Sequence, residues 1–370
     1  MKVEILQEKL VKGVGLVSRV VSSRPQIPIL GNILVVADSL GLHLSGGDGE
    51  IFVKTTVGAK VIKDGSICLP ARTFSELVSS LGPGKIELSS EKNNLSIVSD
   101  SFKGRMNGQD ASEFPRSDQD KESSTLKMGT EAVKSSFSKV VFSAALDTSR
   151  PALAGVLFRK TPKGLQLVAT DAFRLSLVNL NLETKEFTDL IVPAKVLSEV
   201  LRMQADLKDD SVKIVLSPSQ IGFKFEGGEI FSRVIAGNYP AFEKIIPKES
   251  QLQVIVSKNS LEKAVKTAAI FARDSSNIIR IKLKPELELL TVLSSSPTGE
   301  QEQELPAKLE GKLGEELSVA FNYRYFLDLL SNTSSEEIVM ELNGPLSAAV
   351  FRLPNDPGFL HLIMPVRVQN

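Results

Sequence analysis

The segment NYRYFLDLL (residues 322–330) repeats a pattern found twice earlier in the chain, as PARTFSELV (70–78) and PAKVLSEVL (193–201). Each copy has a cation at its third position and an acid at its seventh, and its apolar residues recur at helical spacing. Arg72 and Lys195 are 123 residues apart, and Lys195 and Arg324 are 129 apart. This repetition predicts a chain built from three similar parts.

Other landmarks keep the same offset between the first two parts. PILGNILV begins at residue 28 and PALAGVLF at residue 151, and Asp48 and Asp171 are also 123 residues apart. The third part is looser, because SSNIIRIKL from Ser275 takes the place of PALAGVLF. Polar joins at 116–129 and 247–250 separate the parts. We therefore expect three domains, at about 1–125, 126–250 and 251–370.

Each part has the same order of predicted elements: a helix, strands, the quoted helix and further strands. The first helix of each part has one apolar stripe. The stripes are Leu6, Leu10, Val14, Val17 and Val21; Val133, Phe137, Val140 and Ala144; and Leu261, Val265, Ala268 and Ala272. Short connections favour antiparallel pairing, as in the hairpin at Gly227-Gly228. The predicted fold class is α+β, with two helices against mainly antiparallel sheets in each of three topologically alike domains.

Composition limits the class of protein. Lys+Arg and Asp+Glu both number 44, which argues against a bulk polyanion binder but permits a local basic surface. The single Cys68 allows no disulfide within the chain, and with no secretory signal this indicates a reducing compartment. No apolar run approaches the roughly 18 residues of a membrane span. We expect a cytoplasmic protein that does not enter a membrane.

The sequence lacks a recognisable catalytic or metal-binding motif. His43 and His361 have no metal-ligand spacing, and Gly13-Val-Gly15 lies within a helical stripe, not after a strand. We therefore expect no enzyme activity, no metal and no cofactor. An acid-base site between domains remains an alternative, because carboxylate pairs are plentiful, and a structural protein that polymerises through sheet edges is a third possibility.

Cations gather on the predicted helices. The pairs Arg72/Glu76, Lys195/Glu199 and Arg324/Asp328 are each four residues apart, which allows solvated ion pairs along each helix. A cation in the first helical turn opposes the helix dipole, so its repetition favours an external anion. The first helices add Lys12, Arg19, Lys266 and Arg273, with Arg24 just beyond. Together they predict contacts to the phosphates of double-stranded DNA, without sequence preference.

The motifs RPQIPILGNILV, ATDAFRLSLV, NYPAFEKIIP and the terminal LIMPVRV resemble the bacterial DNA polymerase III beta subunit family, the replicative sliding clamps. The resemblance covers the whole chain. It implies a DNA clamp fold in which two subunits join head to tail into a ring, with helices around the hole. It also implies a homodimer that tethers the replicative polymerase to DNA for processive synthesis and is nucleoid-associated when loaded.

The resemblance further implies functional positions. Arg24, Arg72 and Lys195 match positions that face DNA, and Arg150 lies just before PALAG in a stretch that also approaches DNA. Ile270 and Phe271 match an apolar subunit contact, for which Phe102 and Met106 are plausible partners; burial within their own domains is the competing interpretation. A hydrophobic pocket for linear motifs of the DNA polymerase III alpha subunit, the clamp loader delta subunit, other DNA polymerases and repair proteins would comprise Leu153, Thr170, Ala172, Phe173, Arg174, Leu175, Pro240, Ile245, Leu362, Met364, Pro365, Val366 and Arg367.

The chain departs from the family within this pocket. Ala172-Phe173 replaces a frequent Gly-His, so peptide preference is expected to differ, and Val368 to Asn370 extend beyond Arg367 toward the expected pocket mouth. Taken without the resemblance, ATDAFRL is more simply a strand and Met364 a core residue.

Overall fold

The computed structural model describes residues 1–115, 124–147, 149–182, 186–311 and 316–367. Most of the first polar join and the last three residues therefore lie outside the described part of the chain. The chain divides into two compact units: Met1–Val133 with Lys185–Phe187 and Val196–Val234, and Lys134–Thr184 with Thr188–Lys195 and Ile235–Asn370. The division passes through the middle of the second sequence repeat.

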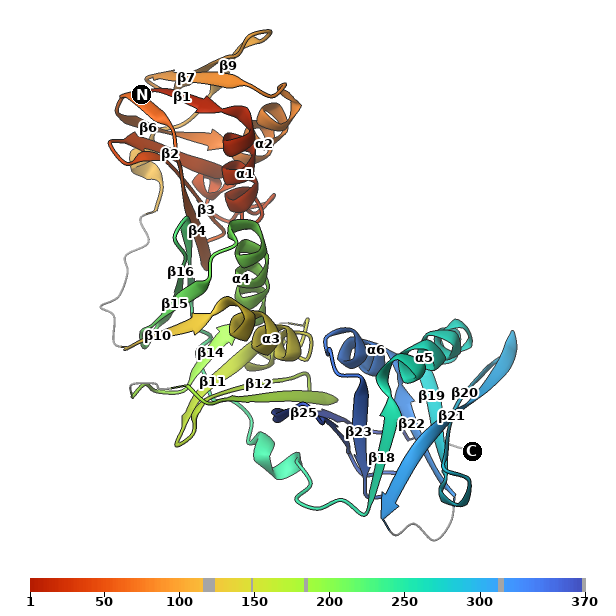
Figure 1. Ribbon diagram of the computed structural model, residues 1–370. Coiled ribbons are helices and arrows are strands. Elements are labelled where there is room, and N and C mark those ends of the chain that lie inside the picture. The colour runs from red at the N-terminus through yellow and green to blue at the C-terminus, as the bar shows by residue number, and fades with distance from the viewer. Residues whose placement is uncertain (116–123, 148, 183–185, 312–315, 368–370) are drawn as a thin grey trace. The chain divides into compact units, whose positions relative to one another are not determined.

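The three repeats, called copies one, two and three, contain the elements labelled in Figure 1. Copy one contains β1 (Lys2–Leu6), α1 (Gln7–Ser18), β2 (Asn32–Asp38), β3 (Gly41–Gly47), β4 (Ile51–Val57), β5 (Lys60–Lys63), β6 (Gly65–Pro70), α2 (Ala71–Ser80), β7 (Lys85–Glu91), β8 (Asn94–Val98) and β9 (Lys103–Asn107). Copy two contains β10 (Ser124–Gly129), α3 (Thr130–Val141), β11 (Gly155–Thr161), β12 (Gly164–Thr170), β13 (Arg174–Leu180), β14 (Leu190–Pro193), α4 (Ala194–Leu207), β15 (Ser211–Leu216), β16 (Gln220–Lys224) and β17 (Gly228–Arg233). Copy three contains β18 (Leu252–Ser257), α5 (Lys258–Ala272), β19 (Ile278–Lys284), β20 (Leu289–Ser296), β21 (Gly299–Gly311), β22 (Leu317–Asn322), α6 (Tyr323–Ser331), β23 (Glu337–Leu342), β24 (Ala349–Leu353) and β25 (Asp356–Ile363).

The same strand pairings occur in every copy, all of them antiparallel. The first strand pairs with the strand that follows the second helix, as β1 with β7, β10 with β15 and β18 with β23. The strand after the first helix pairs with the strand before the second, as β2 with β6, β11 with β14 and β19 with β22. The three sequence repeats are therefore three structural repeats, as the offsets predict.

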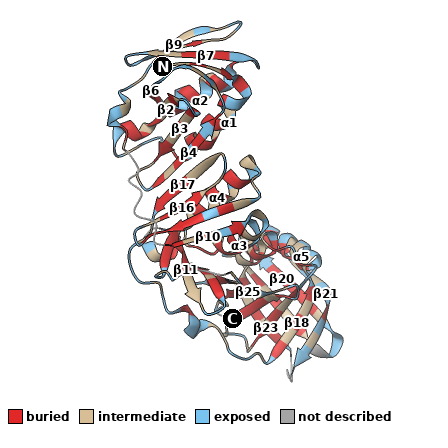
Figure 2. Cartoon of the chain, turned by 60° about the vertical axis from the view of Figure 1, so that its left-hand side comes forward, coloured by how far each residue is buried: buried red, intermediate tan, exposed pale blue. Residues whose placement is uncertain are grey.

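Two sheets join neighbouring copies. β4 of copy one pairs with β17 of copy two, placing Phe52 opposite Phe231, and β13 of copy two pairs with β25 of copy three, placing Leu175 opposite Leu362. The results are an eight-stranded sheet of copies one and two and a twelve-stranded sheet of copies two and three. In Figure 2, buried stretches follow β16, β17 and β4 across the first of these joins. This pairing explains why the chain forms two compact units although it contains three repeats.

The start of copy one corrects the predicted helical stripe. Lys2–Leu6 is a strand, because Val3 and Ile5 alternate with more exposed residues and pair with β7. Leu6 is half exposed at its end. The helix starts only at Gln7, whose side-chain Nε2 donates hydrogen bonds to the carbonyl oxygens of Val78 and Leu81, both 3.0 Å away. The predicted stripes of α3 and α5 are buried throughout.

Helices cover one face of each sheet. α1 packs against α2 and on β3 and β4, and α5 packs against α6 and on β19 to β21, as Figure 1 shows. Gly13 permits this close approach, because a Cβ there would lie 2.5 Å from Val57 Cγ2 and 2.9 Å from Leu44 Cδ1. Its role is in helix–sheet packing. No helix among the described residues is long and apolar enough to cross a membrane.

Candidate functional site

The turn between β12 and β13 is ordered by the Asp171 carboxylate. Asp171 Oδ1 accepts hydrogen bonds from the backbone N–H groups of Phe173 and Arg174, each at 2.9 Å. Thr170 Oγ1 donates to the Arg174 carbonyl at 2.6 Å and accepts from the Ala172 N–H at 3.1 Å. Ala172 has φ of 79°, the left-handed region that favours glycine. Asp48 accepts two matching backbone hydrogen bonds in copy one, where Gly49 supplies the positive φ.

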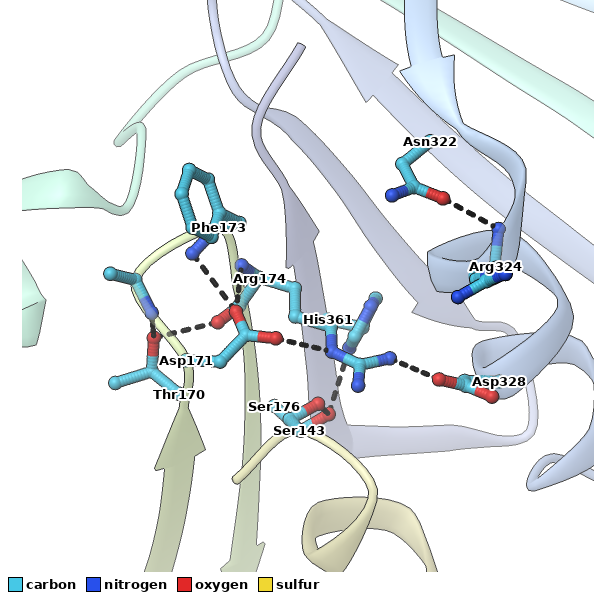
Figure 3. A network of polar contacts seen from close by, with 11 residues as sticks. Ser143, Thr170, Asp171, Phe173, Arg174, Ser176, Asn322, Arg324, Asp328 and His361 are labelled. Carbon is cyan, nitrogen blue, oxygen red and sulfur yellow. Dashed lines mark hydrogen bonds and ion pairs between the residues drawn. The ribbon is translucent and has the colours of Figure 1, made fainter. Parts of the chain in front are cut away.

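Arg174 connects copies two and three through a nearly buried ion network (Figure 3). Its Nε lies 2.9 Å from Asp171 Oδ2, and its other end pairs with Asp328 on α6. The guanidinium also lies 4.7 Å from the ring centre of Tyr325 and 5.6 Å from that of Phe142. Arg174 was expected among the residues of a peptide pocket, but its charged group is engaged by two carboxylates and two rings.

A buried hydrogen-bonded chain lies beside Arg174. His361 Nδ1 is 2.8 Å from Ser176 Oγ, which is 2.7 Å from Ser143 Oγ. His361 Nε2 is buried and has no hydrogen-bond partner among the described residues. Burial, with a smaller contribution from the positive charge of Arg174, lowers the pKa of His361 to about 3. His361, whose sequence position has no metal-ligand spacing, is therefore a neutral core residue of the β13–β25 join.

An apolar cluster covers the opposite, outer face of this join. β13 and β25 contribute alternate residues because side chains two apart in a strand share a face. The buried members include Leu175, Leu177, Leu360, Leu362, Val168 and Phe242, with Tyr239 and Met364 packed against them. We call this surface the C-terminal groove. Met364 is brought in by the hydrogen bond from its N–H to the Phe173 carbonyl, at 2.8 Å.

The structure places the predicted pocket residues at different depths. Leu175, Leu362 and Met364 meet in the cluster, while Leu153 and Thr170 are buried. Phe173 and Ile245 are 61% and 43% exposed, and these two large apolar side chains are available to a ligand. Ala172, Pro240 and Arg367 are exposed, whereas Pro365 and Val366 are intermediate. The Val366 N–H donates to the Ala320 carbonyl at 2.8 Å, which ties the C-terminal segment to β22.

Sequence reasoning missed several members of this cluster. Leu177 lies two residues after the pocket residue Leu175, and Leu360 lies two residues before Leu362, so strand alternation was a usable signal. Tyr239 precedes Pro240, and its hydroxyl donates to the Val168 carbonyl at 3.2 Å. Burial raises the pKa of Tyr239, so it remains a neutral donor. Phe242 lies in the motif NYPAFEKIIP (238–247), but the spacing in that motif does not show which of its apolar residues are buried.

The acids of the repeated helices have different partners in each copy. In copy one, Arg72 Nε pairs with Glu76 Oε1 at 2.9 Å, as an ion pair along one helix would. In copy two, Glu199 is buried and pairs with Arg19 of copy one at 3.7 Å and with Arg202 at 2.5 Å. In copy three, Asp328 pairs with Arg174 of copy two. In copies two and three, the repeated acid therefore pairs with an arginine of the copy before it in the chain.

The predicted DNA-facing cations are exposed but not equally available. Arg24, Arg72, Arg150, Lys195, Lys12 and Arg324 have exposed side chains. Arg19 is already held by Asp206 at 2.8 Å as well as by Glu199, so its charge is countered within the chain. Lys266 pairs with Glu262 at 2.6 Å, and Arg273 Nε donates to the Ala269 carbonyl. Within the described residues, no carboxylate pairs with Lys12, Arg24, Arg150 or Arg324.

The four predicted subunit-contact residues separate into two kinds. Ile270 is 53% exposed near the end of α5, and the adjacent Phe271 ring lies over Gly299, where a Cβ would come within 3.0 Å of it. Phe102 is partly exposed and lies over Gly104 just before β9 begins. Met106 is only 8% exposed, because its side chain points into the core of copy one. Burial within its own copy, the competing interpretation, therefore describes Met106.

Comparison with known proteins places every copy in one family. Residues 1–118, 127–241 and 243–367 match the N-terminal, central and C-terminal domains of the DNA polymerase III beta subunit. The Bacillus subtilis beta sliding clamp is 32% identical over 99% of this chain and 100% of its own length. The Synechococcus elongatus beta sliding clamp is 29% identical over 100% of both.

Solved structures agree with these matches. The Bacillus subtilis DNA polymerase sliding clamp superposes with a TM-score of 0.93 at 31% identity and covers all of both chains. A Pseudomonas aeruginosa sliding clamp bound to griselimycin superposes with a TM-score of 0.91 at 25% identity, again over all of both chains.

Proposed function

The chain belongs to the bacterial DNA polymerase III beta subunit family, the sliding clamps of replication, and we propose that it works as a head-to-tail homodimeric ring around duplex DNA. As a member of this family it is a DNA sliding clamp, a non-catalytic processivity factor and not an enzyme. We place it in the cytoplasm, associated with the nucleoid when loaded, because its DNA substrate is there.

Unpaired strand edges support ring closure. Each join between copies pairs the last strand of one copy with a strand of the copy before it, as β17 with β4 and β25 with β13. β9, the last strand of copy one, pairs only with β8 among the described residues. Residues 299–306 of β21 occupy the position of β4 and β13, and one edge of this stretch has no described partner. β9 of one subunit can therefore pair with β21 of the other.

The helices support the same geometry. Arg19 follows α1 directly and pairs with the acid of the second helix in the next copy, Glu199. Arg273 follows α5 in the same way. In a ring, the next copy after copy three is copy one of the other subunit, which offers the partner subunit's Glu76. Ile270 and Phe271 at the end of α5 would supply the apolar part of this contact.

Dimer formation can be tested by its concentration dependence. Ile270→Asp places a charge in the proposed interface, and it should shift the protein from dimer to monomer in analytical ultracentrifugation. Leu346→Asp is the matched control, because Leu346 is 59% exposed in the same copy and lies outside the proposed interface. Equal dimer affinity for both variants would contradict the proposed contact.

The exposed cations of the helical side are proposed to face the DNA. Contacts to phosphates would give weak binding without sequence preference, while retention depends on encirclement. Loaded clamp should therefore remain on closed circular DNA and leave after a single cut. Retention that is unchanged by linearisation would refute the topological mechanism. Replacing Arg24, Arg72 and Lys195 together by alanine should make the DNA-binding constant depend less steeply on salt concentration, by the amount expected for about three fewer phosphate contacts.

The C-terminal groove is proposed to bind linear motifs of the DNA polymerase III alpha subunit, the clamp loader delta subunit, other polymerases and repair proteins. Its leucines and Met364 offer an adaptable apolar surface, and the exposed Phe173 and Ile245 flank it. Deleting residues 364–370 should abolish binding of an alpha-subunit peptide and leave the dimer intact. Met364→Ala should weaken the same peptide, with Leu346→Ala as control. Unimpaired peptide binding by the deletion variant would refute the assignment.

A further inference from the structure

A second hollow lies on the outer face of the eight-stranded sheet, where copies one and two join. Its volume is about 460 Å³. Val35 and Leu44 are buried on the helix-covered face of β2 and β3, whereas their neighbours Leu34 and Ser45 line the hollow on the other face. We call it the copy-one groove; it is lined chiefly by Leu34, Phe52, Phe114, Phe231, Lys54 and Glu229.

The copy-one groove occupies the same place in its sheet as the C-terminal groove does in the other. Phe52 lies opposite Phe231 as Leu175 lies opposite Leu362. One pleat further on, Lys54 lies opposite Glu229 as Leu177 lies opposite Leu360. Phe114-Pro115 likewise corresponds in sequence to Tyr239-Pro240. The two grooves are therefore the same surface of the fold, repeated at successive joins.

Apolar character is kept at one end of the groove. Phe52 and Phe231 form its floor, and both rings lie close over glycines: a Cβ at Gly47 would come within 2.6 Å of the Phe52 ring, and one at Gly222 within 2.7 Å of the Phe231 ring. These glycines let the two rings lie flat against the strands. Thr170 stands at the position of Gly47 in the C-terminal groove, where Leu175 takes the place of Phe52.

The rest of the groove differs in charge. Lys54 Nζ lies 3.8 Å from Glu229 Oε1, where the C-terminal groove has two leucines. Asp38 also lines the hollow, with Oδ1 2.9 Å from His43 Nε2. The hydrogen bond from His43 is the main reason why the pKa of the Asp38 carboxyl is lowered. Two carboxylates and one lysine therefore line the hollow, so a positively charged ligand is favoured over a negative one near neutral pH.

We propose that the copy-one groove is a second docking site, for an extended peptide with a bulky apolar anchor followed by an arginine. The anchor packs on Phe52 and Phe231, and the guanidinium binds Glu229. The proposal goes beyond the function proposed above and does not require peptides to bind the C-terminal groove.

The test uses the full chain and two fluorescein-labelled probes, Gly-Ser-Leu-Phe-Arg-Gly-Ser and its Arg→Glu counterpart, titrated by fluorescence anisotropy. The arginine probe should bind more tightly than the glutamate probe. Phe52→Ala should weaken the arginine probe about tenfold through the lost anchor contact. Glu229→Lys should weaken it by a similar factor and strengthen the glutamate probe. Glu91→Lys makes the same charge change on β7 outside the groove and should leave both probes unchanged.

Met364→Ala separates this proposal from the C-terminal groove. The arginine probe should bind Met364→Ala as tightly as the unaltered protein, whereas an alpha-subunit peptide should not. If neither probe binds, or the arginine probe binds Phe52→Ala and Glu229→Lys at full strength, the proposal is overturned. Loss of the arginine probe in Met364→Ala alone would also overturn it, by locating binding in the other groove. Unfolding curves of each variant identify any loss of fold, and Ser45→Trp, which fills the groove from β3, gives an independent block.

Discussion

Acidification should destabilise the unit that contains His361. In the folded protein the imidazole is fully buried and burial lowers its pKa to about 3, against 6.5 for an exposed histidine. Because the folded state resists protonation, the unfolded state takes up the proton first as pH falls below 6.5. Stability from this residue is therefore complete above pH 6.5 and is lost progressively down to about pH 3.

The magnitude follows from the separation of the two pKa values. Each pH unit between them is worth about 1.4 kcal/mol, so lowering the pH from 7 to 5 should cost about 2 kcal/mol through His361 alone. His361→Asn removes the titration while an amide can still meet Ser176 Oγ. The variant is expected to be less stable at pH 7, because it loses ring volume, but to lack this part of the pH dependence.

Tyrosine fluorescence is a suitable probe. The chain has three tyrosines and no tryptophan, and Tyr239, Tyr323 and Tyr325 all lie in the same compact unit as His361. Urea unfolding of the unaltered protein and of His361→Asn at pH 7 and pH 5 gives the loss of unfolding free energy on acidification for each. The loss in the unaltered protein minus the loss in the variant is the contribution of His361, because the other titrating groups cancel. A value below about 0.5 kcal/mol, or a larger loss in the variant, would refute the assignment of a neutral buried imidazole.

Two further perturbations test the turn and the ion network. Ala172 has a positive φ where copy one has Gly49, so in urea unfolding Gly49→Ala should destabilise the protein by about 1 kcal/mol. Ala172→Gly should be neutral or should stabilise it by up to about 1 kcal/mol. A destabilising Ala172→Gly would show that the backbone at residue 172 is not strained. Asp328→Asn should lower the free energy of unfolding by about 1–2 kcal/mol, since Arg174 is nearly buried although Asp328 is 44% exposed. Glu76→Gln should lower it by less than about 0.5 kcal/mol, because both Arg72 and Glu76 are exposed. Similar losses for the two variants would contradict the buried role of Arg174.

Two features of the molecule could be predicted from sequence because they depend on the spacing of residues along the chain. The 123-residue offset between Arg72 and Lys195 predicted repeated folds, and the pairing of β1 with β7, β10 with β15 and β18 with β23 confirms them. Apolar periodicity found the buried sides of α3 and α5. The strand at Lys2–Leu6 was missed, because five residues cannot distinguish strand from helix until a partner strand is known.

The positions of functional side chains were less predictable. Each acid of the repeated helix has a cation four residues before it, yet Glu199 and Asp328 pair with arginines more than 150 residues away in sequence. Met106 and Phe102 have similar sequence surroundings, and only the fold shows that Met106 is buried.

The sequence by itself determined the three repeats, the helices and most strands, and the residues that each repeat offers for function. Only the tertiary structure decided that sheets fuse across the repeats, that Arg174 serves a join between copies, and that two equivalent grooves differ in charge. The physical reason is the range of the interactions. Helix periodicity, strand alternation and turn chemistry act over a few residues and are written in order along the chain. Strand partners, buried ion pairs and grooves depend on which distant segments meet, and that is set by the packing of the whole unit.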